Sequence, residues 1–431
     1  MPSPLQEPLP LPCGTVLSNR IAKAAMTEGL ADAEDRATES HQRLYRRWSA
    51  GGAGLLITGN VMVDRRFLER PGNVVIDGNG GRDELRAWAK AGTESGNHLW
   101  MQISHPGRQA SPFSTADLLS ASDVQLHLGG MFSQPRAMTG EEIEDAVRRY
   151  AEVAQVARDC GFTGVQIHAA HGYLISQFLS PVTNRRDDEW GGPLRNRARF
   201  LLEVVAAVRR RVGHDFPVGV KLNSADFQHG GFTLEECVQV ASWLAEADVD
   251  LLEISGGTYE QPRLLGVRGE KDSYSEPKAE STLRREAYFL EYAAAIQAAA
   301  SMPLMVTGGF RSRQAMESAV GNGECAVVGL GRPLCVNPDL PRGLLDGSVD
   351  QAVAWERILR LGPGRLLGTA SPLFLLKAIN VQGQMAWFYQ QLIRLAAGEE
   401  ADPRLGLISA LIRHNMGERR VARRRHYARR H

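Results

Sequence analysis

Two histidines and a tyrosine stand close together in the segment HAAHGYLISQFLSPVTNRRDDEWGG, from His168 to Gly192. His168 and His171 are three residues apart, and Tyr173 follows shortly after them. Two neighbouring imidazoles can donate hydrogen bonds to a carbonyl or phenolate oxygen and stabilise negative charge that develops there. A tyrosine beside them can deliver a proton. Two other interpretations stay open: histidines that bond to loop carbonyls, and a pair of zinc ligands without an obvious third ligand nearby.

Polar residues and glycines recur at the ends of apolar runs elsewhere in the chain. In order, these ends carry Ala25, Met26 and Thr27; Asn60; Gln102; His168; Lys221; Ser255 and Gly256; Gly308 and Gly309; and Gly331 and Arg332. One such residue alone means little. If all of these runs are strands of one parallel sheet, their ends meet at one edge and the side chains can form one site.

The runs themselves have the length and apolar character of strands that are buried on both faces. They are Ile21–Ala25, Leu55–Thr58, Leu99–Ile103, Gly164–His168, Val218–Leu222, Leu251–Ile254, Leu304–Val306 and Ala326–Val328. Amphipathic helical patterns separate them, two of which begin with a capping box, Thr139 with Glu142 and Thr233 with Glu236. Eight alternating strands and helices predict a (β/α)8 TIM barrel. A doubly wound sheet is the alternative, but no G-x-G-x-x-G follows its first strand.

We expect two domains. Residues 1–347 form the barrel, with long polar loops at Ser104–Met138 and Ser255–Thr282, and residues 348–431 form a helical C-terminal extension. Phe374–Ala397 is apolar at helical spacing, and Trp387, Phe388 and Tyr389 within it are interpreted as a packing face rather than a lid. The basic end, Arg419–His431, is expected to be solvated or disordered.

Composition narrows the class of protein. The 431 residues are 43% hydrophobic and 23% charged with a net charge of +1, which argues against a globally basic nucleic-acid binder. No run approaches the ~18 apolar residues of a membrane span. The N-terminus lacks the pattern of a signal peptide. The five cysteines are scattered without C-x-x-C spacing, which predicts no iron–sulfur cluster and a cytoplasmic location.

Several segments together resemble the old yellow enzyme family. They are LSNRIAKAAM (Leu17–Met26), MQISHPGRQA (Met101–Ala110), the His168–Gly192 segment, VGVKLNSADF (Val218–Phe227) and VTGGF…VVGLGRPL (Val306–Leu334). The resemblance covers residues from about 8 to 345, and it is to the bacterial branch with two histidines. It implies a tightly bound FMN, NAD(P)H as hydride donor and ping-pong transfer to an activated, carbonyl- or nitro-conjugated alkene (an ene-reductase).

The resemblance also implies roles for single residues. Gly308, Gly309, Gly331 and Arg332 would bind the FMN phosphate; Lys221 and Gln102 would bind the flavin pyrimidine edge; Ala25, Met26 and Thr27 would line the ring, with Thr27 beside N5 and O4. Asn60 departs from the Ala or Gly that is usual in the family and would contact the ring or narrow the pocket. His168 and His171 would bind the substrate oxygen, and Tyr173 would protonate the α-carbon.

Partners are expected to be small molecules, with no membrane or nucleic acid, and a homo-oligomer is possible. Two other classes stay open. A metal-dependent hydrolase would use His168 and His171 as ligands and would not be yellow. A non-catalytic flavin-binding scaffold would use the C-terminal helix and basic tail to bind a partner.

Overall fold

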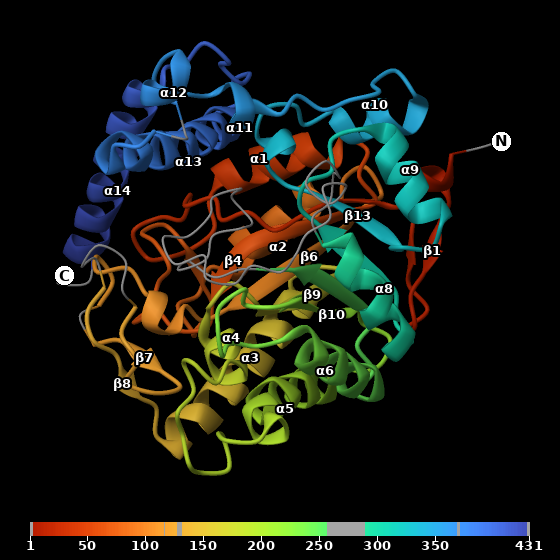
Figure 1. Ribbon diagram of the computed structural model, residues 1–431, viewed down its shortest axis with the longest axis vertical. Helices are drawn as coiled ribbons and strands as arrows, with labels where there is room; N and C mark the ends of the chain where they lie inside the picture. The colour runs from red at the N-terminus through yellow and green to blue at the C-terminus, as the bar shows by residue number, and fades with distance from the viewer. Residues whose placement is uncertain (1–2, 116, 127–131, 257–288, 369–370, 429–431) are drawn as a thin grey trace.

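A closed barrel of eight parallel strands forms the centre of the molecule (Figure 1). The computed structural model describes residues 3–115, 117–126, 132–256, 289–368 and 371–428. The barrel strands are β3 (Ile21–Lys23), β4 (Leu55–Met62), β6 (His98–Ser104), β9 (Gly164–Ala169), β10 (Val218–Asn223), β11 (Leu251–Ser255), β12 (Leu304–Thr307) and β13 (Val327–Leu330). β3 pairs with both β13 and β4, which closes the sheet and confirms the predicted (β/α)8 TIM barrel.

Three strand ends at the candidate site differ from the prediction by two residues or more. β13 ends at Leu330 rather than Val328. β3 ends at Lys23, so Ala25, Met26 and Thr27 lie in the following loop. β4 continues to Met62, with an irregular register between Ile57 and Asn60. At this irregularity the backbone N–H of Gln102 donates to Thr58 Oγ1 at 2.9 Å. The side chain of Thr58 thus replaces the backbone carbonyl that would normally accept this hydrogen bond between the strands. β4 continues after this irregularity, so Asn60 lies inside the strand.

An outer ring of helices surrounds the barrel (Figure 1). The described helices of the ring are α1 (Glu39–Ser49), α2 (Arg82–Gly92), α3 (Gly140–Asp159), α4 (Leu174–Leu179), α5 (Leu194–Val212), α6 (Leu234–Glu246), α8 (Leu290–Ala299), α9 (Arg313–Gly321) and α10 (Leu340–Asp346). Both predicted capping boxes are confirmed, at the starts of α3 and α6. They satisfy backbone N–H groups that a helix start leaves without partners.

Short strands and 3-10 turns lie outside the eight barrel strands. They are β1 (Leu9–Pro10) and β2 (Val16–Leu17), β5 (Val74–Val75), β7 (Leu119–Ser120) and β8 (Arg136–Ala137), with 3-10 turns η1 (Pro4–Gln6), η2 (Gly107–Gln109) and η4 (Arg332–Cys335). β7 and β8 lie within the expected long loop Ser104–Met138. The other expected loop, Ser255–Thr282, lies outside the described residues from 257 onward.

The C-terminal residues form further helices beside α1 (Figure 1). They are α11 (Trp355–Ile358), α12 (Gly364–Leu367), α13 (Phe374–Ala396) and α14 (Leu407–Ala428). α13 packs against α1, η4 and α14. Among the described helices, none is long and apolar enough to cross a membrane.

The basic end differs from the expected disordered tail, because α14 carries it as helix as far as Ala428. Arg419, Arg420, Arg423 and Arg424 are exposed, as a solvated end requires. Arg425 instead is buried and forms an ion pair with Asp35, with Nε 2.6 Å from Oδ1. This buried, charged hydrogen bond holds the end of α14 against the barrel.

Two buried histidines make the stability of the fold sensitive to acid. Burial lowers the pKa of His41 to about 4 and that of His105 to about 4. Between pH 6.5 and 4 the unfolded chain therefore binds more protons than the folded protein, and stability falls as the pH falls. We expect a loss of about 1.4 kcal/mol per pH unit for each histidine in urea unfolding, and a constant contribution from them above pH 6.5.

The variant His105→Asn tests this expectation, with His214→Asn at an exposed position as the matched control. The first should flatten the dependence of unfolding free energy on pH between 6.5 and 5, and the second should leave it unchanged. An unchanged slope in His105→Asn would show that other groups cause the acid sensitivity.

Candidate active site

All the candidate residues named from the sequence line one cavity of about 290 Å³ at the carboxyl ends of the barrel strands. They are Ala25, Met26, Thr27, Asn60, Gln102, His168, His171, Tyr173, Lys221, Gly308, Gly309, Gly331 and Arg332. Four polar lining residues were not foreseen as site residues: Glu69, Thr307, Arg311 and Tyr389. The ends of parallel strands meet at this mouth, which explains why residues from distant segments come together.

The two histidines and the tyrosine form a tight cluster. The ring centroids of His168 and His171 are 5.1 Å apart, and those of His168 and Tyr173 are 4.8 Å apart, both edge to face. His168 Nδ1 accepts a hydrogen bond from the backbone N–H of Ala170 at 3.2 Å. Nδ1 is thus unprotonated, and a neutral His168 carries its proton on Nε2, where it can act as a donor.

His171 is held differently. Its backbone φ is +62°, a left-handed conformation that is uncommon for any residue other than glycine. Its N–H donates to Asn223 Oδ1 at 3.1 Å, and its Nε2 lies 2.8 Å from Ser255 Oγ. These bonds from β10 and β11 fix both the backbone and the ring, and strained conformations held by such bonds concentrate at functional sites.

Electrostatics keep both imidazoles neutral. Burial, then the neighbouring His171 and Lys221, hold the pKa of His168 well below its usual value. Burial and Lys221 lower the pKa of His171 to about 3. Neutral imidazoles can donate one hydrogen bond each and add no charge, so the pair can bind a polar oxygen at neutral pH.

A chain of polar side chains crosses the barrel below the cavity. Gln102 Nε2 donates to Gln166 Oε1 at 2.7 Å, and Gln166 Nε2 donates to Glu253 Oε2 at 2.7 Å. Lys221 Nζ lies 2.9 Å from Glu253 Oε1, with both side chains almost completely buried. Because the amide N–H of Gln102 is used in this chain, its Oε1 is left as the acceptor for a ligand N–H.

We expect Glu253 to stabilise the buried ammonium group of Lys221. The variant Glu253→Met leaves this ammonium without its partner, and removal of one partner of a buried ion pair costs about 3–5 kcal/mol. The double variant Lys221→Met with Glu253→Met should recover most of that loss, since it removes both charges. Unfolding in guanidinium gives the free energy of unfolding of the native protein, of Glu253→Met and of the double variant. If Glu253→Met were as stable as the native protein, the result would contradict the ion pair.

Glycines and arginines surround the opposite end of the cavity. Gly308 and Gly309 have φ values of 124° and 88°, which side chains rarely adopt. Arg311 Nη2 lies 2.5 Å from Glu356 Oε1, and Arg332 Nη2 lies 3.8 Å from the same oxygen. Glycine backbone N–H groups beside two guanidinium groups are chemically suited to a phosphate.

Glu69 lies at the wall formed by β3 and β4. Its Oε2 accepts hydrogen bonds from Thr27 Oγ1 at 2.8 Å and from Asn60 Nδ2 at 2.7 Å. The single hydroxyl proton of Thr27 is therefore directed at Glu69. Asn60 Oδ1 is buried without a hydrogen-bond partner among the described residues, so it can accept from a ligand.

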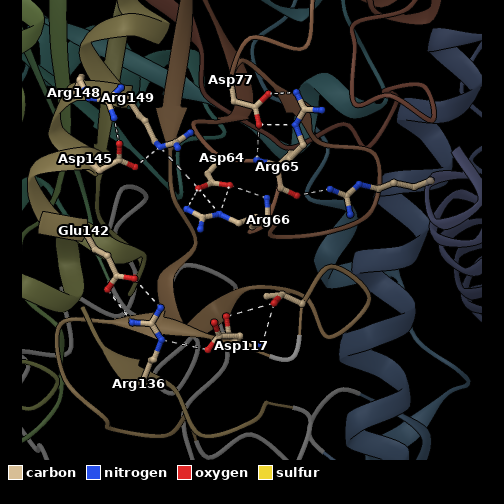
Figure 2. A network of polar contacts seen from close by, with 12 residues as sticks. Asp64, Arg65, Arg66, Asp77, Asp117, Arg136, Glu142, Asp145, Arg148 and Arg149 are labelled. Carbon is tan, nitrogen blue, oxygen red and sulfur yellow. Dashed lines mark hydrogen bonds and ion pairs between the residues drawn. The ribbon is translucent and has the colours of Figure 1, made fainter. Parts of the chain in front are cut away.

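The loop that carries Glu69 is fastened on its outer side by arginine–carboxylate pairs, which Figure 2 shows. Arg66 Nη2 lies 2.6 Å from Asp64 Oδ2, and Arg65 Nη2 lies 2.5 Å from Asp77 Oδ1. Arg149 of α3 also reaches Asp64, at 4.0 Å. The carboxylates of these pairs are buried and the arginines are partly exposed, and a network of such pairs can hold a loop.

The C-terminal extension reaches the cavity through Tyr389. The predicted packing face divides here: Trp387 is fully buried and donates to the carbonyl of Leu405 at 2.9 Å, whereas Tyr389 lines the cavity. Phe388 lines a second cavity of about 270 Å³ between α13 and the barrel, which shares Met26, Thr27, Arg332 and Tyr389 with the first. The interpretation as packing alone is therefore incomplete.

The barrel fold and the glycines and guanidinium groups of this cavity are typical of an enzyme with a phosphorylated cofactor. The sequence profile of the NADH:flavin oxidoreductase / NADH oxidase family matches residues 4–351. The chain belongs to this family and is an FMN-dependent oxidoreductase of the old yellow enzyme type that uses NADH or NADPH.

Similar proteins agree with this assignment. The chain is 36% identical to the NADH-dependent flavin oxidoreductase iccE of Talaromyces variabilis over 422 aligned residues. The alignment covers 91% of this chain and 98% of that protein. The chain is 38% identical over 358 residues to iliE of Hypocrea jecorina, across 78% of this chain and 88% of that protein. The old yellow enzyme homologue of Zymomonas mobilis shares the fold, with a TM-score of 0.68 at 24% identity over 81% of this chain and 94% of the other.

The residues of the cavity fit FMN on chemical grounds. Cationic and glycine-rich groups suit its phosphate, and Lys221 with the free acceptor of Gln102 suits its pyrimidine edge. Asn60 Oδ1 and Thr307 Oγ1 are buried polar atoms without a hydrogen-bond partner among the described residues, as expected where a bound group completes the bonding. In the described part of the chain no group of three or more His, Cys, Asp or Glu is arranged to hold a metal ion.

Proposed function

We propose that this oxidoreductase passes the hydride it receives from NAD(P)H to an activated alkene whose double bond is conjugated to a carbonyl or nitro group. Bound FMN supplies the chemistry of hydride storage between the two substrates, which use the cavity in turn. The observation that carries the proposal is the cluster of His168, His171 and Tyr173, with edge-to-face rings and a fixed proton on His168 Nε2.

Each member of the cluster has a chemical task in the proposal. His168 and His171 donate hydrogen bonds to the carbonyl or nitro oxygen and draw electron density away from the double bond. Hydride then reaches the β-carbon, and the Tyr173 hydroxyl gives its proton to the α-carbon. Neutral histidines suit this task, because an imidazolium so close to Lys221 would be costly to bury.

The remaining candidate residues hold the cofactor in the proposal. Gly308, Gly309, Gly331 and Arg332 bind the phosphate, and Lys221 and Gln102 bind the pyrimidine edge. Ala25, Met26, Thr27 and Asn60 form the wall beside the ring. Residues 1–347 then form the FMN-binding barrel domain and residues 348–431 a helical extension that contributes Tyr389. Small molecules are the partners, and a homo-oligomer is possible.

A single-turnover experiment tests the proposed reaction. Holoenzyme is reduced anaerobically with one equivalent of NADH or NADPH and mixed with cyclohexenone, a nitroalkene or a matched saturated ketone. The first two should restore the oxidised flavin spectrum and yield the saturated product, and the ketone should do neither. If neither alkene is reduced and the flavin is reoxidised only when molecular oxygen is admitted, the result would contradict the proposal and favour an NADH oxidase.

A further inference from the structure

Glu69 is the only aspartate or glutamate among the described residues that line the cavity. It is half-buried, and both of its hydrogen bonds come from neutral groups, Thr27 and Asn60. Within the described part of the chain no Lys or Arg forms an ion pair with it. A carboxylate held in this way keeps its negative charge available to whatever enters the cavity.

The cations of the cavity are compensated from elsewhere. Lys221 pairs with Glu253, and Arg311 and Arg332 lie beside Glu356, which itself is not among the lining residues. The two histidines on the substrate side are neutral. The buried guanidinium of Arg70, which does not line the cavity, attracts Glu69 electrostatically, but it is itself paired with Glu418. The wall of β3 and β4 therefore presents negative charge that no described lining residue neutralises.

Glu69 is also held rigidly, through the next residue. Arg70 Nη2 lies 2.5 Å from Glu418 Oε1 of α14, and the guanidinium carbon of Arg70 lies 3.8 Å from the ring centroid of Tyr389 on α13. The backbone N–H of Arg70 donates to Asn73 Oδ1 at 2.9 Å. The C-terminal helices thus fix the carboxylate and also place an aromatic ring in the wall of the same cavity.

We propose that Glu69 recognises a positively charged nitrogen on the second substrate. A fixed carboxylate in the wall of a cavity attracts a protonated amine or a quaternary ammonium group by its charge. The inference deepens the proposed function and rests on it: the preferred substrate is an activated alkene that carries an organic cation. The oxidised nicotinamide ring is the other source of such a cation, and the test separates the two.

The test uses two cyclohexenones that differ in one substituent, a trimethylammonium group or a tert-butyl group of similar size. Oxidised holoenzyme is titrated with each, and the change in flavin absorption gives the dissociation constant. The native enzyme should bind the cationic ligand about 10- to 100-fold more tightly, because the carboxylate attracts the trimethylammonium group, which has no N–H to donate, by charge alone. Glu69→Gln should abolish this preference, and Glu69→Asp should retain most of it.

Equal affinities in the native enzyme, or an unchanged preference in Glu69→Gln, would overturn the inference. So would a weakened affinity of Glu69→Gln for NAD(P)⁺ with an unchanged ligand preference, because the carboxylate would then serve the hydride donor. If Glu69→Gln fails to fold or to hold FMN, the native enzyme alone decides: its preference should shrink as salt rises from about 0.05 to 0.5 M, and a constant preference would contradict an ionic contact.

The same titrations keep this inference separate from the proposed reaction. Tight, Glu69-dependent binding of the cationic ligand without its reduction would leave the inference standing and refute the proposed reaction. Reduction of both ligands with no difference in affinity would refute the inference and support the reaction.

Discussion

Replacing His168 by alanine should slow the reduction of an activated alkene by about 10²–10³-fold, the usual cost of removing one preorganised donor at a developing oxyanion. The Ala170 N–H fixes the tautomer of this imidazole, so its Nε2 proton is already in place before the substrate binds. Negative charge develops on the substrate oxygen only in the second half of the reaction. The limiting rate of flavin reduction by saturating NAD(P)H should therefore change much less.

Stopped-flow absorbance under anaerobic conditions measures the two half-reactions separately. Tyr173→Phe is the matched comparison, since it keeps both imidazoles and removes only the hydroxyl. It should slow alkene reduction and leave the affinity for the alkene nearly unchanged, whereas His168→Ala should weaken that affinity too. Equal losses in both half-reactions of His168→Ala would contradict the assignment of this residue to the substrate oxygen.

Replacing Arg332 by methionine should weaken FMN binding by about 100-fold or more. The side chain lines the cavity beside Gly331, and guanidinium–phosphate contacts are often two parallel charged hydrogen bonds. Each such bond is worth roughly 1.5–3 kcal/mol, so the loss of the pair is large. Methionine keeps most of the stem and removes only the charged fork.

Quenching of FMN fluorescence on titration with the FMN-free protein gives the dissociation constant. Arg360→Met serves as control, because Arg360 is exposed. The control should bind FMN like the native protein. An unchanged dissociation constant in Arg332→Met would show that the phosphate is bound elsewhere in the cavity.

The sequence was sufficient for the barrel and for most of the cavity. Strands buried on both faces are almost continuously apolar, so the polar residues at their ends stand out. His168, Lys221 and Gln102 were found in this way. The end of β3 was misjudged, because apolar Ala24 and Ala25 continue the pattern after the backbone has left the sheet.

The polar chain below the cavity could not be read from one strand at a time. Gln166 and Glu253 each stand between two apolar residues within a strand. Their roles depend on register, which places Gln102 opposite Gln166 and Lys221 opposite Glu253. Register between strands that are far apart in sequence is fixed by the closed barrel as a whole.

Glu69 and Tyr389 escaped notice for another reason. Glu69 lies in the charged run DRRFLER, where a carboxylate is normally a surface group, and Tyr389 lies in a helical pattern that looks like packing. Only the contact between the C-terminal helices and the β4 loop brings them to the cavity, through Arg70 and Glu418. Such a contact joins residues more than three hundred positions apart and leaves no local signal.

The visible spectrum of the purified protein during anaerobic titration with NADH, and separately with NADPH, tests the central claim most directly. A bound flavin has two absorption bands, at about 370 and 450 nm, and transfer of hydride bleaches the second. We expect a yellow protein that one equivalent of at least one nicotinamide bleaches. A protein that stays colourless after FMN is added, or a bound flavin that neither nicotinamide reduces, would contradict the account.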